Sequence, residues 1–303
     1  MRLRSVELEL PDRAAAVEFL KDPWGLMETG TRGATTYLRG TGDHPYIVAV
    51  TEAPGAAMAA ATFSGSAAEI EALYARAKAS GLPHGEWTGE FDEPGSGAGF
   101  SVTGPEGEPF RFVVEAERVA ALPAESGRPL QVSHVVFNSR DREAATRTLV
   151  DALGFKVSDR TRIMSFLRCD DTHHAVAYAD AKNASLNHIA FEMPDLDSVM
   201  RGIGRLRDAG MEPAWGPGRH GPGNNVFAYF IAPFGACIEY TAEVQRVDDS
   251  YRTGGPEDWK WPPNRTDHWG IAKRDDAKLA TSGAAFPFRA SRERRTGSRL
   301  KRA

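Results

Sequence analysis

The chain has 303 residues, of which 41% are hydrophobic and 26% are charged, and its formal net charge is −4 at pH 7. These values are typical of globular proteins, and the length allows two halves that each bury a core. No apolar run reaches the roughly 18 to 20 residues that a membrane span needs, and no signal-like segment opens the chain. The composition therefore argues against a membrane protein, and we expect a cytoplasmic one.

Strand and helix patterns divide the first half into two similar units. Period-two alternation predicts a strand over 6–10, and apolar spacing after Pro11-Asp12 predicts a helix over 12–20. Two short strands follow, and the second unit has a strand, a helix and two further strands. The predicted strands are 6–10, 37–38, 46–50, 59–63, 100–102 and 110–114, and the helices are 12–20 and 67–79.

The second half repeats this order of elements. The predicted strands are 132–137, 155–158, 163–168, 175–179, 186–192, 226–231 and 236–241, and the helices are 142–153 and 196–208. The sequence therefore predicts an α+β fold of four βαβββ-like modules, paired two by two.

Aligning the halves shows that they form an internal repeat. Residues 5–112 match residues 134–240 at an offset of 128 to 129. Self-similarity of this length indicates a shared fold. We expect an N-terminal domain over 1–122, a second domain of the same fold over 128–245, and an extension over 246–303. The matched pairs include Gly25 with Gly154, Phe63 with Phe191, Gly81 with Gly210 and Gly107 with Gly235.

Three residues of types that bind metals lie in three apolar strand-like runs of the second half, at His134, His188 and Glu239. A single histidine on such a strand is usually a hydrogen-bonded core residue, so each one alone has that simpler reading. A buried carboxylate, however, is costly unless it is paired or bound to a metal. Two imidazoles and one carboxylate on one face of a divalent metal form the ligand set of non-haem Fe(II) oxygenases. Together the three residues predict a metal site with an open face.

The repeat restricts this site to the second half. On the same alignment His134 lies opposite Ser5, His188 opposite Ala60, and Glu239 opposite Arg111. Arginine stays protonated in proteins and has no lone pair for a metal. We therefore expect metal only in the C-terminal half. The two cysteines lack the spacing of a metal finger, which favours reduced packing residues over a disulfide.

Three sequence blocks carry a family resemblance: FLRCDDTHHAVA at 166–177, NHIAF at 187–191 and GPGRHG at 216–221. With the module count and the three ligands, they make the chain resemble type I extradiol ring-cleaving dioxygenases of the vicinal oxygen chelate superfamily. It is most similar to the homoprotocatechuate 2,3-dioxygenase and 2,3-dihydroxybiphenyl 1,2-dioxygenase branches. The likeness is strong from about residue 131 to 270 and extends only to the fold over residues 1–120.

The resemblance implies a fold, a cofactor and a reaction. Each pair of modules would form a half-open barrel, and the C-terminal barrel would hold Fe(II), or less often Mn(II). The activity implied is extradiol cleavage of a catecholic ring with incorporation of dioxygen, in the catabolism of aromatic compounds. The implied partners are the catechol and O2, and a homo-oligomer is expected.

The same resemblance assigns roles around the metal. His174 matches the family's acid/base histidine, although a surface histidine beside a polar turn is the simpler reading, of which His173 is the obvious example. His220 matches a histidine that hydrogen-bonds a substrate oxygen, with a glycine-rich loop residue as the alternative. Tyr229 matches a tyrosine that contacts the bound catecholate, with a packed barrel tyrosine as the alternative.

Other substrate contacts are less specific. Asn225 could be a turn residue or a substrate ligand, and Arg265 could pair with a substrate carboxylate, as could other arginines of this half. Trp215 occupies a position where the homoprotocatechuate branch leads us to expect a basic residue. This departure allows a less acidic or differently shaped catechol.

The C-terminal extension has a different character. Segment 251–270 is rich in aromatic and turn-forming residues, and its Asp-His-Trp-Gly end resembles the segment that caps the active site in the homoprotocatechuate branch. It is either a lid or an extension packed on a neighbouring subunit. The basic run 289–302 is typical of a solvated or assembly-supported tail and is weak evidence for nucleic-acid binding. We expect no nucleic-acid partner.

Three rival functions stay open. A non-catalytic small-molecule binding protein of the same fold would not need the full ligand set or His174. Glyoxalase-like relatives generally gather ligands from two modules, and Ser5, Ala60 and Arg111 remove the N-terminal set. A 4-hydroxyphenylpyruvate dioxygenase also keeps its ligands in the C-terminal half, but its C-terminal helix pattern has no clear match here.

Overall fold

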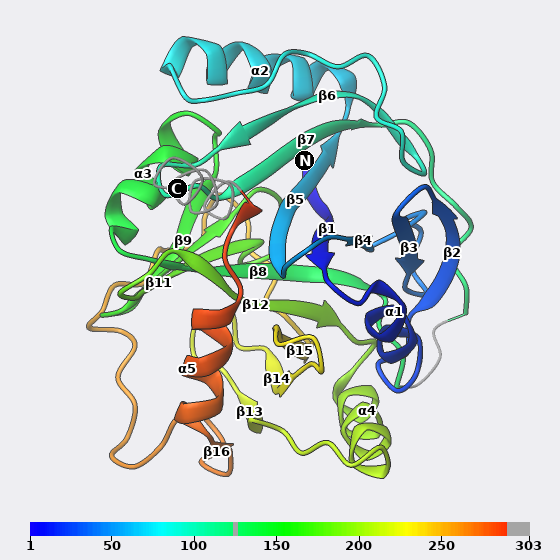
Figure 1. The fold of residues 1–303 in the computed structure, drawn as a ribbon. Coiled ribbons are helices and arrows are strands. Elements are labelled where there is room, and N and C mark those ends of the chain that lie inside the picture. The colour runs from blue at the N-terminus through cyan, green and yellow to red at the C-terminus, as the bar shows by residue number, and fades with distance from the viewer. Residues whose placement is uncertain (124–126, 290–303) are drawn as a thin grey trace, which may run out of the picture.

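The computed structural model describes residues 1–123 and 127–289. These residues form two mixed β-sheets and five helices, whose arrangement is shown in Figure 1. The first sheet has the strand order β2-β3-β4-β1-β5-β7-β6, and the second β16-β13-β14-β15-β12-β8-β11-β10-β9. Most of the predicted basic tail lies outside the described residues. Among the described residues, the structure has no helix of the length and apolar character that would let it span a membrane.

The first sheet belongs to the N-terminal half of the chain. Its strands are β1 (Arg2–Leu10), β2 (Met27–Arg32), β3 (Thr35–Arg39), β4 (Val48–Glu52), β5 (Ala57–Gly65), β6 (Ser96–Thr103) and β7 (Pro109–Glu115), with helices α1 (Arg13–Lys21) and α2 (Ala67–Ser80). β1 pairs in parallel with β4 and antiparallel with β5, so the first two modules meet at β1 and β5.

The second sheet repeats this arrangement in the C-terminal half. Its strands are β8 (Gln131–Ser139), β9 (Lys156–Arg160), β10 (Met164–Arg168), β11 (Val176–Asp180), β12 (Ser185–Glu192), β13 (Trp215–Arg219), β14 (Val226–Ile231), β15 (Cys237–Ala242) and β16 (Lys273–Arg274). The helices are α3 (Arg142–Asp151), α4 (Leu196–Asp208) and α5 (Asp276–Ala285). β8 pairs in parallel with β11 and antiparallel with β12, which confirms the predicted pairing of modules two by two.

Local sequence explains where the helices begin. Asp12, Ser66, Asp141 and Asp195 precede the first four helices, and each side chain accepts a hydrogen bond from the backbone N–H three residues later. Such caps satisfy a backbone donor that has no partner within the helix. Gly81 ends α2 in the left-handed conformation, which glycine adopts without steric cost.

The structure contains elements that the sequence did not predict. β2 and β13 were missed, because METGTR is polar and mostly exposed and WGPGR contains glycine and proline, which are rare in strands. The second module has two strands after its helix, as predicted, where a βαβββ unit has three. In place of the third, residues His84 and Thr88 form isolated bridges to β6. The extension also forms β16 and α5, which the sequence did not predict.

The two halves share a core, although we expected each to bury its own. Trp24, from the N-terminal half, is fully buried and stacks on Tyr240 of β15 with ring centroids 3.9 Å apart. Further rings meet across the junction, Phe63 with Phe155 and Phe110 with Phe137. Cys169 and Cys237 are free thiols, as predicted.

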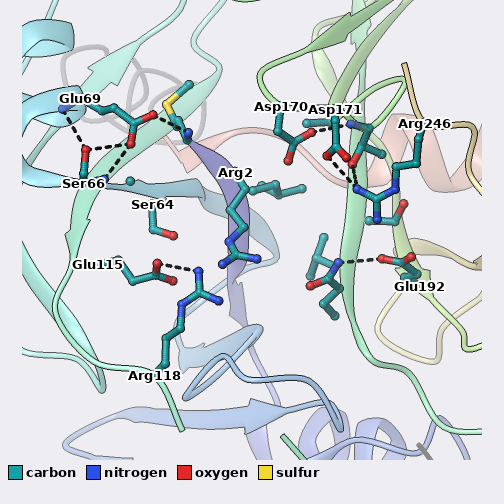
Figure 2. A pocket seen from close by; sticks show the side chains of 18 residues that line it. Arg2, Ser64, Ser66, Glu69, Glu115, Arg118, Asp170, Asp171, Glu192 and Arg246 are labelled. Atoms are coloured by element: carbon teal, nitrogen blue, oxygen red, sulfur yellow. Dashed lines mark hydrogen bonds and ion pairs between the residues drawn. The ribbon is translucent and has the colours of Figure 1, made fainter. Parts of the chain in front are cut away.

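A cavity of about 390 Å³ lies at the junction of the halves. Figure 2 shows Arg2 and Glu115 from the N-terminal half facing Asp171 and Arg246 from the C-terminal half across it. Its lining includes Ser133 but none of the three predicted metal ligands. The cavity is therefore separate from the metal site described next.

Candidate metal centre

Three adjacent strands bring the predicted ligands together. In the sheet register Ala190 of β12 pairs with both His134 of β8 and Glu239 of β15. The pairing of β8 with β12 shifts at two places, where Ser133 and Asn187 have no partner. A β-bulge of this kind redirects the neighbouring side chains and is frequent beside functional sites. Each bulge here directly precedes a histidine ligand.

The three side chains converge at one point. The Oε2 atom of Glu239 lies 3.3 Å from Nε2 of His134 and 3.2 Å from Nε2 of His188. All three residues are buried, with at most 5% of their surface exposed. In the described part of the chain, they are the one set of three or more His, Cys, Asp or Glu residues whose ligand atoms all lie within 4.8 Å of one another.

Two atoms at this point fit a metal. Nε2 of His188 and Oε2 of Glu239 are buried and have no hydrogen-bond partner among the described residues, because the geometry between them is not that of a hydrogen bond. A buried polar atom without a partner is costly. A cation bound by both atoms would remove that cost, and nitrogen and oxygen ligands of this kind suit Fe(II) and Mn(II).

A second layer of polar side chains holds the ligands in place. Nδ1 of His188 donates to Oδ1 of Asn187 at 2.7 Å, and Nδ1 of His134 lies 3.2 Å from Oγ of Ser133. The amide of Asn187 donates in turn to Asn138 at 2.7 Å. A bond at Nδ1 fixes the ring and leaves Nε2 free for a metal. Ser133 and Asn187 are the two bulge residues, so the same irregularity supplies both ring partners.

The electrostatics keep the carboxylate ionised. Burial raises the pKa of Glu239, but the lowering effect of His134 and His188 is larger. The pKa therefore lies well below its ordinary value. Burial lowers the pKa of His188, and Glu239 opposes this change. The ligand set is therefore a carboxylate with a neutral imidazole, the protonation state that binds metal.

His220 and Tyr229, for which the resemblance implies substrate contacts, lie next to each other beside this set. His220 Nε2 and the Tyr229 hydroxyl are 2.9 Å apart, and His220 Nε2 lies 3.9 Å from Oε1 of Glu239. Burial lowers the pKa of His220 to about 3, and burial together with Glu239 holds the pKa of Tyr229 well above its ordinary value. Both groups are neutral near pH 7. Trp215 stacks on Tyr229 with ring centroids 5.0 Å apart.

His174 lies on another side of the ligand set. Its ring is buried and packs on His134 with centroids 4.2 Å apart. His173 is fully buried as well, so its interpretation as a surface histidine was wrong. The error arose because its partner, Asp159, lies on β9 and cannot be recognised from the polar turn at 170–172. Sequence reasoning also missed the roles of Ser133 and Asn187.

The remaining two predicted contacts differ in position. Asn225 is buried and donates to Thr241 at 2.8 Å and to Oε1 of Glu239 at 3.5 Å, so it lies against the ligand carboxylate. Arg265 is exposed, and its side chain packs on Gly270 in the extension. The extension itself reaches the site's edge, where the Thr266 hydroxyl accepts from the indole of Trp215 at 3.3 Å.

Comparison with known proteins identifies the family. A model described as the Glyoxalase/Bleomycin resistance protein/Dioxygenase superfamily matches residues 131–240. The solved structure of a Mn(II)-bound glyoxalase from Novosphingobium aromaticivorans is 31% identical, with a TM-score of 0.84 over 92% of this chain and 93% of that one. The chain belongs to this superfamily.

Other members of the superfamily include ring-cleaving enzymes. Homoprotocatechuate 2,3-dioxygenase from Arthrobacter globiformis is 25% identical, with a TM-score of 0.81 over 92% of this chain and 90% of that one. Metapyrocatechase 2 of Cupriavidus necator is 30% identical over 122 residues, which are 39% of this chain and 38% of that protein. The match thus spans less than half of that curated relative. Superfamily membership confirms the predicted fold of paired modules in two half-open barrels.

Proposed function

We propose that this protein is an extradiol dioxygenase that cleaves a catecholic ring with O2, using Fe(II), or Mn(II), held by His134, His188 and Glu239. The observation that carries the proposal is the buried, unpartnered pair of ligand atoms on His188 and Glu239. Ring-cleaving relatives among the curated and solved proteins support the same reaction class. The assignment places the reaction in the breakdown of aromatic compounds.

The metal would supply one part of the chemistry. When bound, it would gather the catechol and O2 at one ion and lower the pKa of the catechol hydroxyls through its charge. The protein would supply orientation and proton transfer. His220 and Tyr229, joined at 2.9 Å, form a neutral polar pair that can hydrogen-bond a substrate oxygen. His174, beside His134, is the proposed acid and base.

Two further roles follow from position. Asn225 contacts Glu239, so we propose that it orients this carboxylate, in addition to the substrate contact predicted for it. Arg265 is on the exposed side of the extension and would need to turn inward to meet a substrate carboxylate. The predicted homo-oligomer, the cytoplasmic location and the extents of the three domains stay predictions.

Anaerobic reconstitution with Fe(II), and separately with Mn(II), tests the proposal. Each form is screened in an oxygen electrode with catechol, 3,4-dihydroxyphenylacetate, 2,3-dihydroxybiphenyl, hydroxyquinol and 4-hydroxyphenylpyruvate. We expect equimolar consumption of O2 and one catechol, with a ring-opened semialdehyde as product. Glu239→Gln protein treated in the same way is the control. Binding of catechols without O2 uptake would favour a non-catalytic binding protein instead.

Glyoxalase activity is a second candidate, because a protein described as a glyoxalase is 31% identical over nearly the whole chain. The hemithioacetal of methylglyoxal and glutathione therefore belongs in the same screen. The absence of metal-binding residues at Ser5, Ala60 and Arg111 disfavours a ligand set drawn from both halves. Isomerisation of the hemithioacetal without catechol cleavage would replace the first proposal by this one.

A further inference from the structure

A chain of hydrogen bonds leads away from the metal centre behind His174. Nδ1 of His174 lies 3.0 Å from Nδ1 of His173, and Nε2 of His173 lies 2.8 Å from Oδ2 of Asp159. The two histidines and the aspartate are all buried, with at most 3% of their surface exposed. The chain joins β9 to the segment before β11 and ends at the proposed acid/base.

The direction of each hydrogen bond follows from the chemistry of the groups. An ionised carboxylate only accepts hydrogen bonds, so Nε2 of His173 carries the proton that it shares with Asp159. A neutral imidazole has one protonated and one free nitrogen, which makes Nδ1 of His173 an acceptor. Nδ1 of His174 must then be the donor. The remaining nitrogen of His174, Nε2, is on the far side of its ring and has a free lone pair.

The C-terminal extension secures the end of this chain. The Tyr251 hydroxyl donates to Oδ2 of Asp159 at 3.1 Å, and the backbone N–H of Gly254 donates to Oδ1 at 2.6 Å. Together with Nε2 of His173, these two groups are the hydrogen-bond donors to this carboxylate among the described residues. Because a buried carboxylate is costly without partners, these donors hold Asp159 in one orientation.

We propose that Asp159 and His173 are positioning residues that fix His174 with Nδ1 protonated and Nε2 free to accept a proton. The inference rests on the proposed function and deepens it. In the step concerned, a catechol O–H bond breaks, its electron pair stays on the oxygen, and an N–H bond forms at Nε2 of His174. The positive charge then on His174 is balanced through His173 by Asp159. When the ring has opened, Nε2 of His174 gives the same proton to the ring-opened product.

A purely structural role for Asp159 and His173 makes a different prediction. If the contact only fastened the 170–174 segment to β9, its loss would disturb the neighbouring His134 and with it the metal. If it sets the tautomer of His174, its loss would leave metal and substrate binding intact and slow turnover. Measurements of metal content, KM and kcat therefore distinguish the two roles. The structural role predicts loss of metal, and the positioning role predicts a lower kcat with metal content and KM unchanged.

Asp159→Asn and His173→Gln, each reconstituted with Fe(II), test the inference. We expect metal content and KM for the best catechol of the screen to stay within about 3-fold, and kcat to fall by about 10²- to 10⁴-fold, the usual contribution of acid/base help. Asp171→Asn is the matched control, because this residue of the same segment is exposed and its carboxylate pairs with Arg246 of the extension and not with the Asp159–His173–His174 chain. Its kcat should equal that of the wild type.

Anaerobic binding of 4-nitrocatechol gives a second readout, because the absorbance of this probe shifts with each lost proton. Wild-type holoenzyme should bind it with both hydroxyls ionised, and Asp159→Asn should bind it with one. If Asp159→Asn and His173→Gln both keep the wild-type kcat and the wild-type spectrum of bound 4-nitrocatechol, this inference is overturned and the proposed function is not. Loss of metal in both variants would also overturn it, in favour of a structural role. Failure of the wild type to cleave any catechol would overturn the proposed function and this inference with it.

Discussion

The two halves of the molecule place different chemistry on the same strand framework. In the C-terminal half Ala190 pairs with His134 and Glu239, and at the equivalent place in the N-terminal half Thr62 pairs with Ser5 and Arg111. The pairing of β1 with β5 shifts at Arg4, one position before Ser5, as the pairing of β8 with β12 shifts at Ser133, one position before His134. The internal repeat thus extends to these shifts in strand register.

The difference lies in how each half neutralises buried carboxylates. Arg111 lies 2.8 Å from both Glu7 and Glu93, and Arg4 lies 2.7 Å from Glu93. Arginine is permanently charged and supplies several donors, so both carboxylates of this network are paired without an added ion. Glu239 instead faces two imidazoles, and its Oε2 atom has no hydrogen-bond partner in the part of the chain that the structure describes. In the N-terminal half the positively charged Arg111 fills the position, and in the C-terminal half the equivalent position is open to a cation.

The largest expected effect is the loss of metal from the open position. Glu239→Gln and His134→Ala should each fold but retain little of the one Fe(II) or Mn(II) expected per chain, because a neutral amide or a methyl group replaces a ligand. Elemental analysis after reconstitution measures this. Ser5→Ala, at the equivalent place of the other half, is the control and should keep full metal. Full occupancy in both ligand variants would contradict the assignment.

The same comparison makes a crystallographic prediction. Crystals grown with Mn(II) should show anomalous density at His134, His188 and Glu239 and none within the N-terminal sheet. The reason is that Arg111 already occupies the equivalent place with positive charge. A well-occupied second ion between β1 and β7 would refute the idea that the network closes this position.

A smaller effect is expected from His174, which lies beside the ligands without belonging to them. His174→Phe should bind metal and catechol with turnover slowed by about 10²- to 10⁴-fold, because general acid/base help is lost. Metal analysis and steady-state kinetics on one preparation check both parts. Unchanged kcat would assign proton transfer to water, His220 or Tyr229.

In the N-terminal half the expected effect is on stability. Arg111→Met leaves Glu7 without its arginine partner and Glu93 with Arg4 alone, and removal of one member of a buried ion pair typically costs about 3 to 5 kcal/mol. Urea unfolding measures the loss, and metal per folded chain should stay constant. Arg32→Met is the matched control, because the Arg32–Asp92 pair is exposed and is expected to contribute at most about 1 kcal/mol. Equal losses of unfolding free energy in the two variants would contradict this difference between the buried and the exposed ion pair.

The smallest effect concerns His44, a buried residue of the N-terminal half. Burial, with a contribution from Arg2, lowers its pKa from 6.5 to about 4. The unfolded chain therefore binds this proton first as the pH falls, and stability is lost between pH 6.5 and 4. The loss at pH 5 relative to pH 7 should be about 2 kcal/mol. Urea unfolding of wild type and His44→Leu at both pH values measures it, and an identical pH dependence would disprove it.

Sequence by itself located the module order and the three ligands. Both follow from local periodicity and from the repeat, which sets His134, His188 and Glu239 against residues that hold no metal. Local patterns failed for β2 and β13, whose polar and glycine-rich segments join the sheets only through pairing with neighbouring strands. Secondary structure that depends on a partner strand leaves a weak local signal.

Only the tertiary structure decided what surrounds the ligands. Asp159 and His173 are 14 residues apart and meet because β9 and the segment before β11 lie together, as do Trp24 and Tyr240, which are 216 residues apart. The C-terminal extension reaches the same region, where Tyr251 and Gly254 donate hydrogen bonds to Asp159. The ligand types and their periodicity are properties of short stretches of chain, so sequence determines them. The partner that fixes a ring, a tautomer or a buried charge comes from a distant segment, so folding determines it.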